Sequence, residues 1–384
     1  MTQGTISSAP IRLSGSLSAA PAEPVRRASP SPLPDSLRSY IPFIGKIFAV
    51  AMALRCLVAL LAYWNRNIAG ILWPRGIEML GVAKSLATGN GFSSPFPIPT
   101  GPTAFVPPIY PSILSVILRI FGDHTNASAW AILLLQCFVS ALTVAPIFAL
   151  ALDSFGRREA KAAAWLWALF PYAIILPTNI IWESSLSAFV VAVGAWLLLR
   201  AWRSRGTSRW LYATIWWAAG CLLNAALLLL LPAAAFYSFL RKKIPFATLA
   251  ACAAAFIAVL APWSIRNYLV MGRAVPLRDN FALEMWIGNH SGTAFRFTPE
   301  IHPAFNAADL RHYQQIGELA YMDEKGAEAR AFIRANPGQF AVNTLERIAR
   351  FWLIGRNGLI YLVAPLAILG IVGLCVALRR AVPA

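Results

Sequence analysis

The sequence predicts an all-α polytopic membrane helix bundle that crosses the bilayer about eight times and carries interfacial helices in its extracytoplasmic loops. Apolar residues make up 58% of the 384-residue chain, more than soluble domains ordinarily contain. They gather in runs, most of which approach the ~20 residues that a helix needs to span a bilayer. Many of the 14 tryptophans fit helix ends at the lipid–water boundary.

Residues 1–40 are rich in Pro, Ser, Ala and Arg and lack periodicity, so we expect a disordered cytoplasmic tail. The apolar runs follow, and each is expected to form one span. They lie at about 44–64, 128–152, 160–178, 184–201, 209–223, 225–240, 246–263 and 357–378. The sequence leaves open whether 209–240 is one span or a hairpin of two, broken near Asn224.

Charge predicts the orientation of these spans. If the N-terminus is cytoplasmic, the short basic loops around Arg157, Arg203 and Arg241 all fall on the cytoplasmic side, as the positive-inside rule requires. The C-terminus is then cytoplasmic as well. This bias accounts for the net charge of +17 without the nucleic-acid partner that such a charge suggests in a soluble protein.

Four regions follow from this map: the tail 1–40, a membrane module 41–263, an extracytoplasmic loop region 264–356, and a last span with a cytoplasmic tail, 357–384. The module includes a first outer loop, 65–127. Within it, the apolar segment 108–121 is short for a span and contains Arg119, so we expect a helix on the outer membrane surface. The second loop region should contain a helix near 306–335, ended by Asn336-Pro337-Gly338, and should pack over the first.

Glu78 stands just outside the first span in a chain with only 16 acidic residues. An ionised carboxylate at the membrane boundary costs free energy, because apolar surroundings disfavour its charged form. Pro74 suits the first turn of a helix and Gly89 its end. On that helix Arg75, Glu78 and Ser85 share a face. An ordinary polar face is the simpler interpretation of the helix alone.

The residues after Glu78 favour a functional interpretation. They read E-x-x-x-x-A-x-S-L-A-x-G-x-G-F-S-S-P-F, then T-G-P-T-A and P-P-x-Y-P. This pattern resembles the first outer loop of GT-C-type polyprenyl-phosphate-sugar transferases, the group of protein mannosyltransferases and aminoarabinose transferases, in a bacterial branch. Similar short pieces recur at Ile181-Trp182-Glu183, in the run from Pro262 to Tyr268, at Pro276-Leu277-Arg278 and at Gly288-Asn289.

The resemblance implies a sugar donor linked to polyprenyl phosphate, a lipid, glycan or protein acceptor, and a site at the outer face of a bacterial inner (plasma) membrane. It gives Glu78 the role of the base that deprotonates the acceptor, which suits inverting transfer. It makes Glu183 a second site acid; the alternative is an acid favoured by the N-terminal dipole of its helix. No cofactor is required; a divalent metal between the two carboxylates is compatible with the sequence but not demanded by it.

The remaining candidates would bind the donor or the substrate. For the donor phosphate, Arg266 and Arg278 suit a planar, bidentate contact, and Lys84 lies near the level of Glu78. A lipid-headgroup anchor is the alternative for Arg266. The candidates for substrate contact are Asn267, Asn289, His290 and Tyr110.

A transporter or flippase for a lipid-linked or anionic substrate is the rival function. Such a protein needs charged groups along a path through the membrane. The acids of this chain gather at the outer ends of the spans, and Arg55 is the deep exception. This distribution favours an enzyme.

Overall fold

In the computed structural model, the chain divides into two compact units, 1–40 and 41–384. The described part of the first unit contains one short helix, α1 (Asp35–Arg38). The second unit is helical wherever it is described, apart from turns, loops and one isolated bridge between Ser93 and Pro102. The structure describes residues 35–204, 206–229, 237, 239, 241, 244–290, 299–353, 365, 368–370 and 372.

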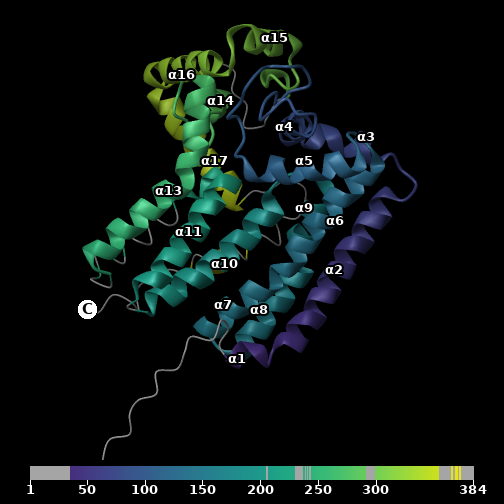
Figure 1. The fold of residues 1–384 in the computed structure, drawn as a ribbon, viewed down its shortest axis with the longest axis vertical. Helices are drawn as coiled ribbons and strands as arrows, with labels where there is room; N and C mark the ends of the chain where they lie inside the picture. Colours follow the sequence, from purple (N-terminus) through teal and green to yellow (C-terminus); the bar gives the residue numbers. More distant parts are fainter. Residues whose placement is uncertain are drawn as a thin grey trace, which may run out of the picture. The chain divides into compact units, whose positions relative to one another are not determined.

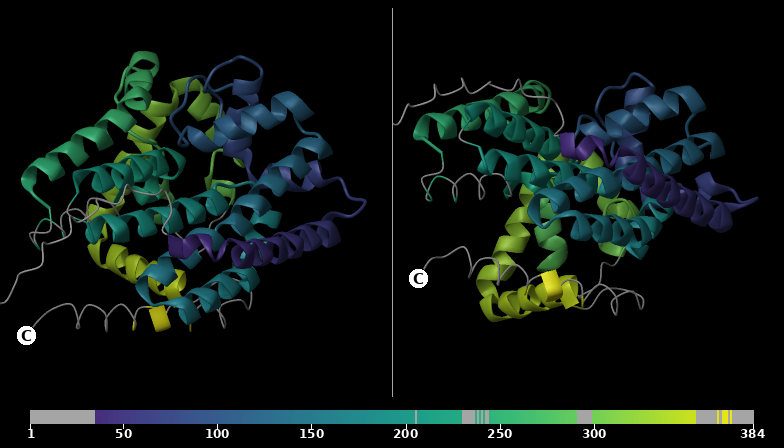
Figure 2. Two further views of the ribbon diagram at one scale, coloured as in Figure 1. Left: turned by 60° about the horizontal axis from the view of Figure 1, so that its bottom comes forward. Right: turned by 90° about the horizontal axis from the view of Figure 1, so that it is seen from below.

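Five helical stretches of the described residues are long and apolar enough to cross a membrane, and the predicted class of all-α polytopic membrane protein is confirmed. In Figures 1 and 2, α10, α11 and α13 follow one another across the bundle. The five stretches are α2 (Ile41–Tyr63), α6 with α7 (Asn126–Leu142 and Val144–Ser154), α8 with α9 (Arg157–Leu169 and Pro171–Asn179), α10 (Ser184–Trp202) and α13 (Phe246–Met271).

The other predicted spans are tested only in part. Helix α11 (Thr207–Leu223) has 17 residues and ends at Asn224, where the sequence suggests a break. The short 3-10 helix η2 (Ala225–Leu229) follows. The rest of the predicted span 225–240, and most of 357–378, lie outside the described residues.

Helices α6 and α9 are joined where Pro177 interrupts the backbone hydrogen bonding of α9. Pro177 has no N–H to donate to the carbonyl of Ala173, four residues earlier. The Ser140 hydroxyl donates to that carbonyl instead, at 2.7 Å. The hydroxyl from the neighbouring helix α6 thus satisfies the Ala173 carbonyl, which water would not reach inside a bilayer.

Arg55 is fully buried in α2 and has a structural role. Its guanidinium donates to Ser140 Oγ at 3.0 Å and to the carbonyls of Ala51 and Ala168 at 2.9 and 3.2 Å. Ala168 lies in the last turn of α8, where carbonyls lack helical donors and the helix dipole favours a cation. Arg55 therefore binds α2 to the C-terminal end of α8.

One end of the bundle is covered by two chain segments, 65–121 and the described residues of 272–335 (272–290 and 299–335), which we call the cap. It occupies the upper part of Figure 1, around the labels α4, α14, α15 and α16. Its helices are α3 (Ile68–Leu72), η1 (Trp73–Arg75), α4 (Ile77–Ala87), α5 (Ile109–Phe121), α14 (Phe281–Gly288), η3 (Pro299–Ile301), α15 (Ala307–Ile316) and α16 (Glu318–Ala335), and α17 (Pro337–Leu353) follows them.

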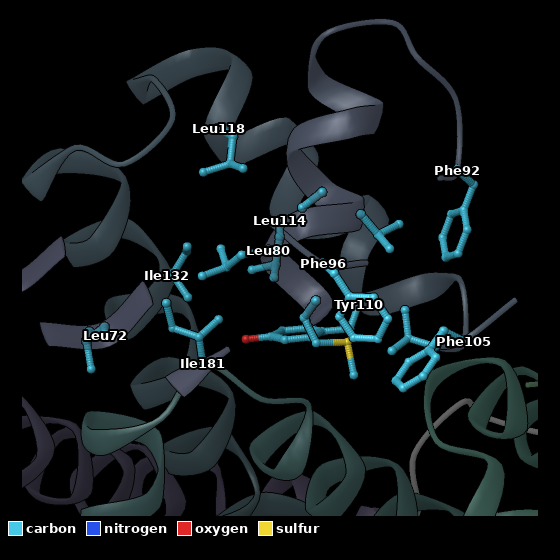
Figure 3. Packing of buried hydrophobic residues seen from close by; sticks show 14 of the residues in the cluster. Leu72, Leu80, Phe92, Phe96, Phe105, Tyr110, Leu114, Leu118, Ile132 and Ile181 are labelled. Carbon is cyan, nitrogen blue, oxygen red and sulfur yellow. The ribbon is translucent and has the colours of Figure 1, made fainter. Parts of the chain in front are cut away.

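A buried apolar cluster joins the first cap segment to the bundle. Figure 3 shows Leu80 of α4, Tyr110 and Leu114 of α5 and Ile132 of α6 packed together, with Phe96 and Phe105 of the connecting loop nearby. Helix α5 has only 13 residues and packs on α4 and α6. Its length agrees with the prediction that segment 108–121 is not a span.

The two cap segments are joined by buried polar contacts. The carboxylate of Glu318 accepts hydrogen bonds from the Thr103 hydroxyl, from the Ala104 N–H at 2.6 Å and from the Tyr313 hydroxyl. The Asp279 N–H donates to the Ala104 carbonyl at 3.1 Å. The first outer loop and the second loop region therefore pack against each other, as the sequence suggested.

Three local predictions are wrong. The helix expected at 306–335 is two helices, because Gly317 takes a positive φ of 81°, which ends α15. Helix α13 runs past Pro262 to Met271, so Arg266 belongs to the helix rather than to the loop after it. Helix α4 does not present its whole polar face outward, because Ser85 is buried and bonded to Ser93.

Candidate functional site

Glu78 lies in the first turn of α4, where the chain makes a very close approach to the segment before α10. Gly76 caps α4, and a Cβ added there would come within 2.8 Å of the Ile181 backbone oxygen. Only glycine allows this approach without a shift. The contact brings the start of α4 against the turn that carries Glu183, more than a hundred positions further along the chain.

The carboxyl group of Glu78 is mostly covered, with 15% of its side chain exposed, and Oε1 lies 3.8 Å from Nε2 of His302. Burial raises the pKa of Glu78, its own backbone N–H lowers it, and the charges of Glu284 and Arg278 raise and lower it, respectively. The carboxyl group is therefore more basic than an exposed glutamate.

His302, just after η3, is a site residue that the sequence reasoning missed. Its ring is buried against Phe96 and Phe105. Nδ1 accepts the Ala304 N–H at 3.2 Å, so in the neutral ring the proton is on Nε2, which faces Glu78. Burial lowers the pKa of His302 to about 4, and the ring is neutral at neutral pH.

Glu183 caps the N-terminus of α10 and is almost completely buried. Its Oε2 has no hydrogen-bond partner among the described residues. Burial raises its pKa to about 7; its own backbone N–H and Arg278 lower the value, and Glu78 raises it. Both acids that the resemblance selected thus lie within electrostatic reach of each other and of Arg278.

A buried amide fixes the turn before Glu183. Gln136 Nε2 donates to the carbonyls of Pro177 and Ile180 at 2.9 and 3.0 Å, and its Oε1 accepts the Trp182 N–H at 3.1 Å. The hydroxyl of Tyr110 donates to the same Oε1 at 2.6 Å. Tyr110 is fully buried, so in this structure it supports the turn.

Arg278 supplies the positive charge of the site. It donates from Nε to Asn280 Oδ1 and lies 3.6 Å from Glu284 Oε1. Burial lowers its pKa, while the charges of Glu284, Glu183, Glu78 and Asp279 raise it. We call Glu78, Glu183, Arg278, Glu284 and His302 the acid–arginine group. Glu284, on α14, is the second member that sequence reasoning missed.

The other arginine predicted to bind phosphate, Arg266 of α13, is bound to the loop of the cap that joins α4 to α5, which we call the cap loop. Arg266 donates to the carbonyls of Thr103 and Phe92 at 2.8 and 2.6 Å and to Asn267 Oδ1 at 2.9 Å. Its guanidinium also lies over the rings of Phe92 and Trp263. Asn267 is fully buried and donates to the Val275 carbonyl at 2.8 Å. Both residues hold loops in place here, and phosphate binding by Arg266 stays a prediction.

The remaining predicted residues, Lys84, Asn289 and His290, have partners outside the acid–arginine group. Lys84 is 60% exposed and pairs with Asp123 at 2.9 Å. Asn289 is buried at the end of α14 and donates to the Met285 carbonyl. His290 stacks on Trp286 with ring centroids 4.7 Å apart. Phosphate binding by Lys84 and substrate contact by Asn289 and His290 stay predictions.

A cavity of about 840 Å³ borders α4. Ile77 and Gly81 belong to its wall, and none of the five residues of the acid–arginine group lines it. Most of the wall is apolar, and Lys84, Asp123 and several hydroxyl groups contribute polar atoms. The described residues contain no group of three or more His, Cys, Asp or Glu side chains that could hold a metal ion.

Residues 106–265 match the family model described as dolichyl-phosphate-mannose-protein mannosyltransferase. The match supports a GT-C-type glycosyltransferase. It confirms the resemblance seen in the sequence, and with the apolar helices it indicates a multi-pass membrane glycosyltransferase that uses a lipid-linked sugar donor. The matched segment covers less than half of the chain and ends before Arg278. No similar curated protein and no similar solved structure is found.

Proposed function

We propose that this glycosyltransferase moves a sugar from a polyprenyl-phosphate carrier to a hydroxyl group of its acceptor at the outer face of a bacterial plasma membrane. The observation that carries the proposal is the acid–arginine group. It brings Glu78 and Glu183, from two separate chain segments, within electrostatic reach of Arg278 from a third. A base and a phosphate-binding cation in one site are what inverting transfer from a lipid phosphate requires.

Glu78 is proposed as the general base. It takes the proton from the acceptor hydroxyl while the acceptor oxygen attacks the anomeric carbon. The bond from that carbon to the phosphate oxygen breaks, and polyprenyl phosphate leaves with the electron pair. A raised pKa brings the carboxylate closer to the operating pH, which favours proton transfer. The Nε2–H of His302, 3.8 Å away, would orient this carboxylate.

Arg278 is proposed to neutralise the phosphate as it becomes the leaving group. A guanidinium suits this role because its planar N–H groups can bind two phosphate oxygens. Glu183 is proposed to hold the sugar or the acceptor through its unpaired Oε2.

The decisive experiment compares Glu78→Gln with the wild type in transfer from a panel of polyprenyl-phosphate sugars. The substitution keeps the shape and removes the proton acceptor, so transfer should fall about a hundredfold or more. Binding of polyprenyl monophosphate and the thermal unfolding temperature should stay near wild-type values. Near-normal transfer by a well-folded Glu78→Gln protein would refute the assignment of the base.

The outer-face placement needs its own experiment. In a cysteine-free background, Ala307→Cys should react with an impermeant maleimide added outside intact cells, because α15 belongs to the cap. Ser208→Cys, at the start of α11, should react only after permeabilisation. Both positions are exposed. Labelling of Ser208→Cys from outside would reverse the orientation and move the site to the cytoplasmic side.

The transporter alternative gains no support from the described spans. Arg55, the charged residue within the first span, donates hydrogen bonds to Ser140 and to backbone carbonyls. A group held this way ties helices together and does not line a path.

A further inference from the structure

Glu284 is the loosest member of the acid–arginine group. Its Oε1 lies 3.6 Å from Arg278 Nη2, beyond hydrogen-bond distance, and its side chain is 55% exposed. The Asn280 amide donates to the same oxygen at 3.2 Å. Glu78 and Glu183, by contrast, are buried within packed elements. An exposed carboxylate on a surface helix can change its rotamer at little cost, whereas the two buried acids cannot.

The position of Glu284 is the one from which an incoming anion would reach Arg278. The side chain of Arg278 is 26% exposed and that of Glu284 is 55% exposed, so both can be reached from outside the fold. The side chain of Glu78 is only 15% exposed and Glu183 is almost completely buried. A phosphate that approaches from solvent or lipid therefore meets Arg278 and Glu284 together.

We infer that Glu284 is an anionic placeholder, which holds the guanidinium of Arg278 until the phosphate of the lipid-linked donor displaces it. The exchange preserves charge, because the donor phosphodiester and the carboxylate each carry one negative charge. It also preserves the polar contacts, because the Asn280 amide and the Arg278 guanidinium can both donate to a phosphate oxygen. The inference rests on the phosphate role proposed for Arg278.

A displaceable carboxylate has two physical consequences. It competes with the donor and so weakens donor binding by the strength of the ion pair it forms with Arg278. It also adds negative charge near Glu78, whose pKa it helps to raise. Removal of Glu284 should therefore tighten phosphate binding, which is the opposite of what the loss of a purely structural residue does.

The test measures the binding of polyprenyl monophosphate, the leaving group of the reaction, to the full-length protein in detergent. Glu284→Gln keeps the size of the side chain and the contact with Asn280. Because the pair is half-exposed, the expected gain in affinity is about two- to fivefold, and it should shrink at high ionic strength. Glu324→Gln is the matched control: Glu324 is a similarly exposed acid of the cap, paired with His312, and its loss should leave affinity unchanged.

A double-mutant cycle with Arg278→Ala separates the placeholder from a general charge effect. In the Arg278→Ala background, Glu284→Gln should give no gain. Unchanged or weaker binding by Glu284→Gln, or an equal gain in Glu324→Gln, would overturn the inference. Wild-type binding by Arg278→Ala would instead overturn the phosphate role of Arg278 in the proposed function, so the two failures are distinguishable.

Discussion

The role of Arg266 can be decided by replacing it with alanine. The substitution removes two charge-assisted hydrogen bonds to backbone carbonyls of the cap loop, those of Phe92 and Thr103. Hydrogen bonds of this kind contribute about 1.5–3 kcal/mol each, so Arg266→Ala should lower the free energy of unfolding by about 3–6 kcal/mol. Arg266→Lys can restore one of these bonds at most, so its free energy of unfolding should lie between those of Arg266→Ala and the wild type.

The same loop links Arg266 to catalysis indirectly. It carries Phe96, whose ring packs against His302, which in turn contacts Glu78. A loosened loop should therefore lower turnover by about tenfold or more, because small shifts of a catalytic group are costly. Binding of polyprenyl monophosphate should change by no more than about threefold, an amount worth less than 1 kcal/mol.

Thermal unfolding and phosphate binding are measured together on Arg266→Ala, Arg266→Lys and the control Arg273→Ala. Arg273 forms an exposed ion pair with Asp323, and its loss should cost no more than about 1 kcal/mol. If Arg266→Ala lost phosphate binding more than tenfold with an unchanged unfolding temperature, the loop-clamp reasoning would be refuted and Arg266 would be the phosphate ligand.

Two further predictions concern single side chains of the site. Because the folded pKa of Glu183 is raised to about 7, native stability falls as pH rises from about 4.5 through 7. Glu183→Gln, which resembles the neutral form, should be more stable than the wild type at pH 8 by on the order of 3 kcal/mol, with the difference vanishing near pH 4. An equal difference in the free energy of unfolding at the two pH values would contradict this. Lys84→Ala should change phosphate binding less than twofold, because Lys84 is exposed and paired with Asp123. A large loss of binding in Lys84→Ala would restore Lys84 as a phosphate ligand.

Sequence reasoning was effective where a signal is local. Long apolar runs predicted the positions of the five spans, because each run must bury its own backbone polar groups. It failed where a tertiary contact overrides a local signal. The predicted span ended at residue 263, yet α13 continues past Pro262 to Met271, since a helix can lose one hydrogen bond and keep its course. Gly317 split a predicted helix because its φ is positive.

The same distinction applies to the site. Glu78, Glu183 and Arg278 were selected from family-like motifs, which can be read along the chain. His302 and Glu284 have no such motif, and they reach Glu78 only because the second cap segment folds over the first. The contact between Thr103 and Glu318 that helps to fix this arrangement joins residues 215 positions apart. No local pattern predicts which of the four histidines would face the acid.

The charges of the site raise a problem that the pKa shifts resolve. A lipid phosphate must approach Arg278 while the carboxyl groups of Glu78, Glu183 and Glu284 surround it, and three full negative charges would repel the phosphate. Burial raises the pKa of Glu78, and raises that of Glu183 to about 7, so Glu183 is close to half-protonated at neutral pH.

Asp279, beside Arg278, adds little charge to this balance. Burial and the neighbouring carboxylate of Glu318 raise the pKa of Asp279 well above its usual range, which favours its neutral form. The contact between the cap segments at Asp279 therefore positions Arg278 without adding a further full negative charge beside it. If Glu284 also gives way, the approaching phosphate meets one cation, a Glu183 that is close to half-protonated and the ionised Glu78. That acid must stay ionised, because it is the group that takes the proton.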